Sequence, residues 1–411
     1  MRFVKEKTNT TPIEDTVFAI VKKAKAAKEQ IGKENVIDAT IGSLYNEEEA
    51  IVAFDSVFTP YNNIKKEVKA AYAQSFVGND TFRKQVYQWV CEDKITKLHH
   101  SVIATPGGTG AISISFEELL DRDETVVLPE IAWGSYKLMA SMDGLQVKTY
   151  SLFEENHFNL SNFKKVCNEV MDEQHKLLVV INDPCHNPTG YSLSMEEWKE
   201  VVSFLNECSE NGPVILLNDI AYIDYSYDLD HSRDYMTTFN EFNENVMSIV
   251  AFSCSKALTS YGLRCGAAII LAKQQESVRE VEIVLEKAAR ANWSNIPNAA
   301  MENFTYVTTT NKDAYMKEKN TYVELLKERS SIFKTEAEEC GLTCYPYKEG
   351  FFVTVKVEDN EIRDKFHEEL MKHHIYTVKV NKGIRVAVCS LSVEKTKGLA
   401  KQMKDILNSI K

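Results

Sequence analysis

Several features that mark membrane, zinc-binding or nucleic-acid-binding proteins are missing from this sequence. It has no run of roughly 18 apolar residues, so we expect no segment to cross a membrane. Its nine cysteines include no CxxC pair, and scattered thiols are typical of reduced cytoplasmic proteins. There is no Lys/Arg-rich run and the formal net charge is −12, which argues against nucleic-acid binding.

The N-terminus and the histidines lack two further signals. The first residues, MRFVKEKTNTTP, include no apolar h-region, so we expect no secretory signal. The pairs His99-His100 and His373-His374 have no partner at metal-ligand spacing. We therefore expect both pairs to be solvated and no metal to be bound.

The apolar residues that are present suffice for a large core. The chain has 411 residues, 44% of them hydrophobic, and this length favours more than one domain. Residues 1–11 are polar, and we expect an arm. Thr11, Pro12 and Glu14 fit a capping box that begins a helix, and Gly32 is expected to end it. Asp80 is predicted to cap a later helix that reaches about residue 97.

Apolar strands alternate with amphipathic helices through the middle of the chain. This alternation predicts a mostly parallel sheet with helices on both faces. Strands are expected at 101–105, 125–128, 145–150, 177–181 and 214–217, and helices at 111–120, 131–142, 161–174 and 194–210. In such sheets function gathers at the carboxyl ends of the strands. Polar clusters follow three strands, at 107–110, 183–190 and 219–222.

The pattern changes after residue 273. We expect a charged helix to about residue 290, a break at Pro297, helices at 298–308 and 312–340, and strands at 351–357 and 384–389. Such a tail is typical of a smaller α+β domain. The predicted fold is therefore α/β, with a large domain whose mostly parallel sheet is flanked by helices. The predicted division is an N-terminal arm with part of the small domain (1–45), the large domain (46–296) and the small C-terminal domain (297–411).

Lys256 stands between two short apolar runs, 248–252 and 267–271, which are typical of buried strands. Its neighbours are small, and Arg264 follows in the same loop. Burial lowers the pKa of an amine, and a neutral amine can form a Schiff base with an aldehyde. From this stretch alone, an ordinary surface lysine in a hairpin is the alternative.

The stretch from Gly107 to Gly110 joins a predicted strand to a predicted helix. Backbone N–H groups at a helix start, left open by glycine, form an anion site suited to phosphate. A plain tight turn capped by glycine is the alternative.

Four motifs follow one another along the chain: NDPCHNPTG, NDIAY, SCSKALTSYGLRCG and GIRVAVCSLS. In this order and at these spacings they resemble the fold-type I aminotransferases, which use pyridoxal 5′-phosphate. The resemblance covers about residues 35–389 and is to the branch of the aspartate and aromatic aminotransferases. It implies a large domain that binds pyridoxal phosphate.

The resemblance implies a role around the cofactor for each matching residue. Lys256 would bind the cofactor as an internal aldimine and then carry the proton between Cα and C4′. Asp219 would pair with the pyridine nitrogen and keep it protonated. Asn187 and Tyr222 would donate to the 3′ oxygen of the ring, with Tyr222 counted among the catalytic residues. The phosphate would be held by Gly108, Thr109, Ser253 and Arg264.

Four further residues match positions near the substrate or the cofactor ring. Arg385 matches the arginine that clamps the substrate α-carboxylate, and Gly42 matches a glycine beside the substrate, as Asn187 does. Trp133 matches an aromatic residue that stacks on the ring, although it could be simple core. Tyr72 matches a tyrosine that reaches the phosphate of the neighbouring subunit, although a surface residue would also fit.

The segment RANWSNIP, which begins at Arg290, resembles a segment of the same branch. In that branch the arginine belongs to the opposite subunit. It binds the side-chain carboxylate of the substrate, aspartate or glutamate. Together with Tyr72, this resemblance implies a homodimer with shared active sites. The alternative is that Arg290 only ends a charged helix, where its charge favours the helix dipole.

Three positions depart from the family pattern. The glycine loop usually reads Ser-Gly-Thr-Gly, whereas here Gly107 comes first, so one phosphate hydroxyl is missing. Thr259 stands where the family often has glycine, and Asp183 where it often has asparagine. None of these changes removes a catalytic group.

The sequence thus predicts an aminotransferase that passes the amino group of aspartate or an aromatic amino acid to a 2-oxo acid such as 2-oxoglutarate. A C–S β-lyase with the same cofactor, or an aminotransferase for another amino acid, stays open because the fold permits either. A transcription regulator is disfavoured, since only about 35 residues precede the matching region and the chain is acidic. The expected partners are these substrates and a second copy of the chain, with no nucleic acid and no membrane.

Overall fold

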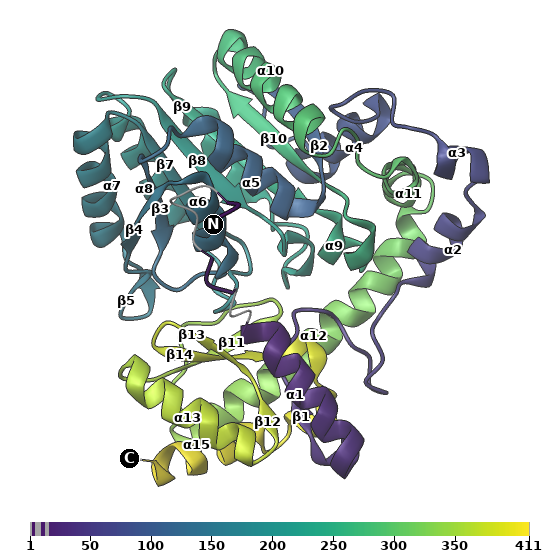
Figure 1. Ribbon diagram of the computed structural model, residues 1–411, viewed down its shortest axis with the longest axis vertical. Helices are drawn as coiled ribbons and strands as arrows, with labels where there is room; N and C mark the ends of the chain where they lie inside the picture. The colour runs from purple at the N-terminus through teal and green to yellow at the C-terminus, as the bar shows by residue number, and fades with distance from the viewer. Residues whose placement is uncertain (1, 5–9, 13–15, 411) are drawn as a thin grey trace.

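The computed structural model describes residues 2–4, 10–12 and 16–410. Two bodies make up the protein: a large one around a central sheet and a small one beside it (Figure 1). The predicted capping box at 11–14 lies partly outside the described residues. The helix that it was expected to open, α1 (Thr16–Ile31), ends before Gly32, whose φ is 90°.

The central sheet has seven strands in the order β2-β10-β9-β8-β7-β3-β4. Only β10 runs antiparallel to its neighbours, and the other pairs are parallel. This arrangement confirms the predicted α/β fold with a mostly parallel sheet. The strands are β2 (His99–Thr105), β3 (Thr125–Pro129), β4 (Gln146–Tyr150), β7 (Leu177–Asn182), β8 (Val214–Asp219), β9 (Val246–Ser253) and β10 (Gly266–Ala272).

Alternate residues of the strands pack against two different helical layers, because successive side chains of a strand point to opposite faces. On one face, residues such as Val180 and Leu217 join side chains of α5 (Gly107–Leu119), α6 (Ser135–Asp143) and α10 (Gln275–Asn292). On the other, residues such as Val179 and Leu216 join α4 (Asp80–Cys91), α7 (Leu160–Gln174) and α8 (Met195–Cys208). With both faces covered, inner strands such as β7 and β8 are apolar along nearly their whole length.

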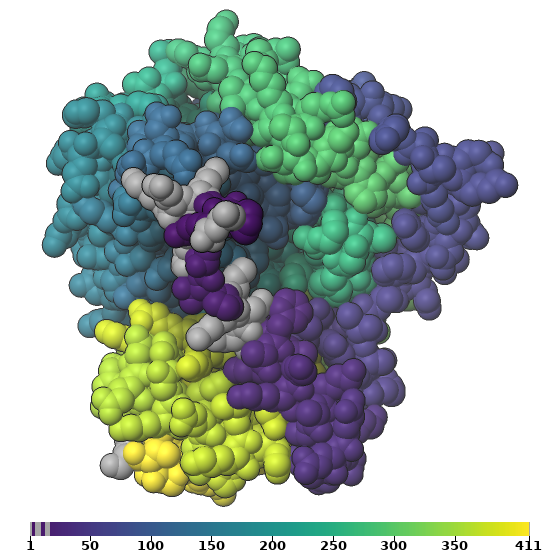
Figure 2. All heavy atoms as spheres, in the orientation of Figure 1, coloured from purple at the N-terminus to yellow at the C-terminus, as the bar shows by residue number. Residues whose placement is uncertain are grey.

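The small body is built on an antiparallel sheet in the order β11-β14-β13, in which Val378 lies opposite Arg385. The N-terminal part of the chain joins this body, since β1 (Ile37–Asp38) pairs with β12 (Ile375–Tyr376). In Figure 2 the yellow-green atoms of this body lie against the purple ones of the N-terminal part. Its other elements are β11 (Phe352–Lys356), α13 (Asn360–Lys372), β13 (Val378–Val380), β14 (Gly383–Ala387), α14 (Val393–Thr396) and α15 (Leu399–Ser409).

The long helix α12 (Lys312–Cys340) connects the two bodies, and α11 (Asn298–Thr308) precedes it (Figure 1). Both have the predicted bounds. The expected start of α8 is also confirmed: Ser194 Oγ accepts from the Glu197 backbone, and the Glu197 carboxylate accepts from the Ser194 backbone. The remaining short elements are α2 (Asp55–Asn63), α3 (Lys66–Ala70), β5 (Phe153–Glu154), β6 (His157–Phe158) and α9 (Cys254–Ala257).

The bounds of three helices were predicted wrongly. The helix expected from 131 begins at Ser135, so Trp133 lies in the turn before it. Asp80 is the first helical residue rather than the cap, which is Asn79, and the helix ends at Cys91 because Glu92 has a left-handed φ of 48°. The helix expected from 111 already begins at Gly107, so the glycine loop is itself the first helical turn. None of the helices in the described part of the chain is long and apolar enough to cross a membrane.

Candidate active site

Lys256 lies on the short helix α9, directly after β9. Its amine points inward and donates to the Gly42 carbonyl at 2.5 Å. The rings of Tyr261 and Tyr222 lie 4.8 and 5.5 Å from the same nitrogen. Burial, reinforced by the charges of nearby arginines, lowers the pKa of Lys256 to about 8. The amine is therefore enclosed by protein and can lose its proton near neutral pH.

Asp219 ends the neighbouring strand β8 and is 5% exposed. Its Oδ2 accepts from the Tyr136 hydroxyl at 2.5 Å, and its Oδ1 accepts from the Ala221 backbone at 3.0 Å. Burial raises the pKa of Asp219, and these two hydrogen bonds oppose the rise. In the described part of the chain, no lysine or arginine forms an ion pair with it. A buried carboxyl without a cation partner fits a protonated pyridine nitrogen.

The glycine loop and the Arg264 side chain meet at the edge of the sheet. A Cβ on Gly107 would lie 2.8 Å from the Arg264 guanidinium, and one on Gly108 would lie 3.3 Å from Cβ of Ser253. Arg264 donates to Ser255 Oγ at 3.2 Å and to the backbone carbonyls of residues 261 and 106. A cation, a hydroxyl and the open first turn of α5 together fit a phosphate.

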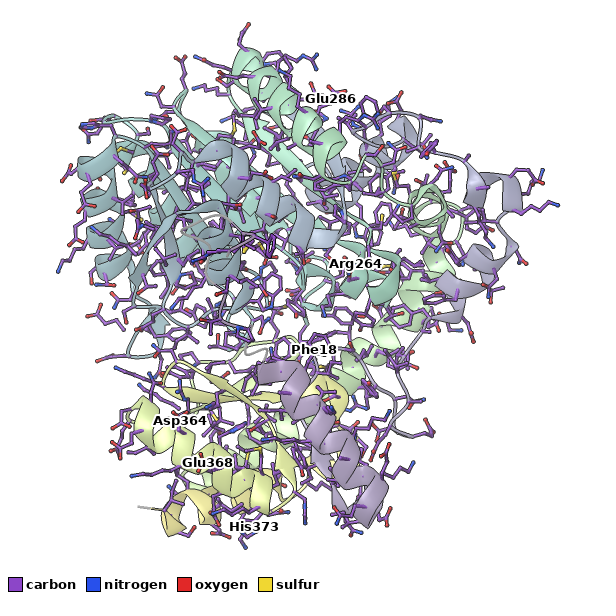
Figure 3. All side chains as sticks on the ribbon, in the orientation of Figure 1. Phe18, Arg264, Glu286, Asp364, Glu368 and His373 are labelled. Atoms are coloured by element: carbon purple, nitrogen blue, oxygen red, sulfur yellow. The ribbon has the colours of Figure 1, made fainter. Side chains whose placement is uncertain are left out.

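Thr109 lies on this first turn of α5 and is exposed. In Figure 3, Arg264 lies on the side of the large body that faces the small one. The predicted phosphate residues are thus brought together around one helix start.

Arg385 is buried on β14 of the small body. Its Nη1 donates to Asn187 Oδ1 at 3.2 Å and its Nη2 to the Thr40 carbonyl at 2.6 Å, while the Phe352 ring lies 4.3 Å from Cζ. Its Nε has no hydrogen-bond partner among the described residues. Arg385, Asn187 and Trp133 line one cavity of 580 Å³ between the two bodies. A buried cation with an unused donor, facing a cavity, fits a carboxylate ligand.

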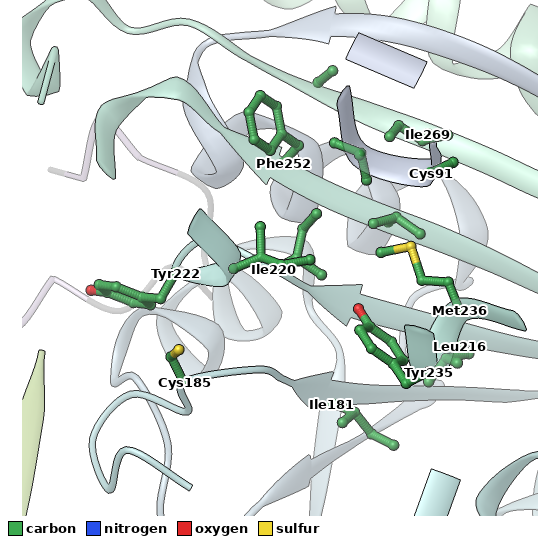
Figure 4. Close-up of a cluster of buried hydrophobic side chains, with 14 of the residues drawn as sticks. Cys91, Ile181, Cys185, Leu216, Ile220, Tyr222, Tyr235, Met236, Phe252 and Ile269 are labelled. Atoms are coloured by element: carbon green, nitrogen blue, oxygen red, sulfur yellow. The ribbon is translucent and has the colours of Figure 1, made fainter. Parts of the chain in front are cut away.

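Tyr222 and Gly42 complete the cluster of predicted site residues that contains Lys256, Asn187 and Arg385. Tyr222 lies just beyond the end of β8, with its hydroxyl directed away from the buried apolar side chains behind it (Figure 4). A Cβ on Gly42 would lie 2.8 Å from the Phe352 ring and 3.6 Å from the Tyr222 hydroxyl. Glycine is therefore needed there to let the segment that bonds Lys256 approach these two rings.

Two predicted residues lie apart from this cluster in the single chain. Tyr72 is 84% exposed. Arg290, in the last turn of α10, donates to Ser294 Oγ at 2.5 Å and lies 4.6 Å from the Phe76 ring. Asn295 donates to the carbonyl of residue 75. The two segments that carry Tyr72 and Arg290 therefore lie side by side on the surface.

The two unusual residues at family positions have structural partners. Asp183 accepts from the Leu193 backbone at 2.7 Å and from Trp198 Nε1 at 2.8 Å, and burial raises its pKa to about 7. Thr259 has a left-handed φ of 47°, a conformation that favours glycine, and its Oγ1 accepts from the Phe54 backbone at 3.1 Å.

Sequence reasoning missed three residues of the cluster: Tyr136, Tyr261 and Phe352. Each resembles an ordinary core aromatic in the sequence, because a buried tyrosine or phenylalanine has no local motif. Two signals were available: Tyr261 lies within the motif SCSKALTSYGLRCG, and Tyr136 follows Trp133 by three residues. Within residues 16–410, no group of three or more His, Cys, Asp or Glu side chains is placed to hold a metal ion.

Comparison with known proteins connects this geometry to a family. The family model for aminotransferase class I and II matches residues 35–403. A crystal structure of an aminotransferase from Anaerococcus prevotii superposes with a TM-score of 0.96 at 33% identity, covering 99% of this chain and 100% of that one.

Curated relatives match over a shorter length. The aspartate aminotransferase of Escherichia coli is 29% identical over 195 residues, 47% of this chain and 48% of that protein. The match thus spans about half the length of these curated relatives. The aromatic-amino-acid aminotransferase of Burkholderia pseudomallei, solved covalently bound to pyridoxal phosphate, shares the fold at 19% identity with a TM-score of 0.77, covering 99% of this chain and 100% of that one. The chain therefore belongs to the class I and II aminotransferases, whose cofactor is pyridoxal 5′-phosphate.

Proposed function

We propose that this protein is an aminotransferase that moves an amino group from an amino acid to a 2-oxo acid. The observation that carries the proposal is the enclosure of Lys256, whose amine contacts the Gly42 carbonyl and the rings of Tyr222 and Tyr261. With a pKa of about 8, about one tenth of this amine is neutral at pH 7, compared with less than about one in a thousand for an ordinary lysine. A neutral amine is the reactive form.

The residues around Lys256 would hold pyridoxal phosphate at several points. Asp219 would hold the proton on the ring nitrogen, Trp133 would stack on the ring, and Asn187 and Tyr222 would donate to the ring oxygen. The phosphate would be bound by Gly108, Thr109, Ser253 and Arg264. When bound, the cofactor withdraws electrons from the substrate α-carbon, which makes its proton acidic.

The other steps belong to the side chains of this chain. Lys256 would take the proton from the substrate α-carbon and return it, as a general base and then a general acid. Arg385 would hold the α-carboxylate so that this proton faces the amine. Gly42 and Phe352, which approach each other closely, would keep water from this space.

We further propose a homodimer in which Tyr72 and Arg290 reach the active site of the partner. Both lie in neighbouring exposed segments, and Arg290 contacts Phe76, an aromatic side chain that is 41% exposed. Exposed aromatic side chains of this kind are enriched at interfaces, and two-fold dimers are the commonest assembly.

In that dimer, Arg290 would pair with the second carboxylate of a dicarboxylic substrate. We therefore propose aspartate or an aromatic amino acid as donor and 2-oxoglutarate as acceptor.

A cytoplasmic location is also a proposal, supported by the nine free cysteines. The division into residues 1–45, 46–296 and 297–411 stays a prediction.

The decisive experiment supplies purified protein with pyridoxal phosphate and a matrix of amino donors and 2-oxo acids. We expect 2-oxo acid to form from the donor only when an acceptor is present, and no turnover by Lys256→Ala. Ammonia and pyruvate released from a cysteine conjugate without an acceptor would instead identify a C–S β-lyase. No reaction with any pair would refute the proposal.

A further inference from the structure

We infer that Tyr136 is a positioning residue, whose hydroxyl orients the Asp219 carboxylate and keeps it ionised so that it can hold the proton of the cofactor ring nitrogen. The inference rests on the proposed function, because it takes Asp219 as the partner of that nitrogen. It concerns a residue of this chain that lies behind the residues proposed to contact the cofactor.

The geometry around Asp219 leaves little freedom to its carboxylate. Tyr136 donates to Oδ2 at 2.5 Å and the Ala221 backbone donates to Oδ1 at 3.0 Å. Tyr136 is fully buried, and its hydroxyl has no other hydrogen-bond partner among the described residues. Its single proton is therefore available to the carboxylate alone, and one donor on each oxygen fixes the plane of the carboxyl group.

Tyr136 also touches the other residue proposed to contact the ring. Its ring meets the Trp133 ring edge-to-face, with centroids 5.5 Å apart and an angle of 82°. Tyr136 lies in the first turn of α6, and Trp133 lies in the turn just before it. One buried side chain thus supports both Asp219, which would lie at the ring nitrogen, and Trp133, which would lie on the ring face.

The charges around Asp219 explain why a hydroxyl is needed there. Burial favours the neutral acid and raises the pKa of Asp219, and among the described residues the Tyr136 hydroxyl and the Ala221 backbone N–H counter it. Among the described residues, the other titratable groups facing this pair are Tyr222, beyond β8, and Tyr150 on β4; burial raises the pKa of both, so both are neutral. Without the Tyr136 hydroxyl the acid would protonate at a higher pH, and a neutral carboxylic acid holds a pyridinium proton poorly.

Tyr136→Phe removes this hydroxyl and keeps the ring that packs in the core. Tyr150→Phe is the matched control, because Tyr150 is equally buried but donates to the Val180 carbonyl at 3.1 Å. The affinity of each protein is measured, by absorbance titration or dialysis, for pyridoxal phosphate and for its 1-deaza analogue, in which a carbon replaces the ring nitrogen.

We expect Tyr136→Phe to weaken pyridoxal phosphate binding by about tenfold or more, as for a lost hydrogen bond to a charged group. The loss should grow as the pH falls, and the 1-deaza analogue should bind to both proteins within about threefold. Tyr150→Phe should bind both compounds like the wild type. An equal loss for both compounds would show that Tyr136 only packs, and no loss for either would also overturn the inference.

A further variant covers the case in which Tyr136→Phe does not fold. Replacing Tyr136 by 3-fluorotyrosine keeps the ring and makes the hydroxyl a stronger donor, so pyridoxal phosphate should bind more tightly while the 1-deaza analogue is unaffected. An unchanged affinity for pyridoxal phosphate would contradict the inference. Failure of the wild type to bind either compound would instead refute the proposed function, so the two failures are distinguishable.

Discussion

Arg385 gives a test of substrate binding that does not depend on the identity of the substrate. Every amino acid carries the α-carboxylate that this guanidinium is proposed to hold. Arg385→Gln would leave that carboxylate without its cation in the cavity shared with Trp133 and Asn187. Breaking a buried ion pair costs about 3–5 kcal/mol, which corresponds to a loss of about 150- to 5,000-fold in kcat/KM.

The assay is the kcat/KM of Arg385→Gln for aspartate, phenylalanine and alanine, together with the affinity for pyridoxal phosphate. The loss should be similar for all three donors, and the cofactor should bind as in the wild type. Arg279→Gln is the control, because Arg279 is exposed and pairs with Glu282 on α10. A loss confined to aspartate, or an unchanged kcat/KM, would refute the assignment of the α-carboxylate to Arg385.

Four further outcomes are expected. Asp219→Asn should bind the cofactor more weakly, as Tyr136→Phe is expected to, but still retain it at saturating concentration, and it should slow proton transfer severely in single turnovers, because an amide cannot hold the pyridine proton; a wild-type rate would contradict this. Arg290→Ala should cost about 3–5 kcal/mol in transition-state binding for dicarboxylic substrates and much less for aromatic donors, whereas equal losses would show that Arg290 only ends its helix. Mixing Lys256→Ala chains with Tyr72→Phe/Arg290→Ala chains should restore some activity, and a fully active monomer in sedimentation would exclude shared sites. Finally, the pKa of Lys256 in the folded state is about 8, lower than the ordinary value of about 10.5. The unfolded state therefore binds more protons than the folded state between pH 8 and 10.5. The free energy of unfolding of the cofactor-free protein, measured against that of Lys256→Met, should rise with pH in that window.

The sheet could be predicted from the sequence because its chemistry is local. Strands such as β7 and β8 are continuously apolar and end in polar motifs, and both properties are visible in single stretches. The helix α12 has the predicted bounds, about 312–340, and in the structure Gly341 ends it with a left-handed φ of 70°. The position of Lys256 at a strand end followed from the same reasoning.

Features that depend on distant parts of the chain were missed. The hydrogen bond from Tyr136 to Asp219 joins residues from α6 and β8, and no local pattern distinguishes this tyrosine from core. Trp133 was placed in a helix because the apolar periodicity extends past the turn that precedes Ser135. The capping of α4 was misread because Asn79 and Asp80 are both good N-caps, and Asn79 takes that position while its side chain bonds to α11.

The central claim is that Lys256 carries the cofactor, and trapping the bond tests it most directly. The protein is incubated with pyridoxal phosphate, reduced with borohydride, digested and examined by mass spectrometry. We predict one phosphopyridoxyl group per chain, on the peptide that contains Lys256, and none at that site in Lys256→Ala. Labelling of a different buried lysine, such as Lys319, whose pKa is also lowered to about 8 by burial, or of no lysine at all, would contradict the account.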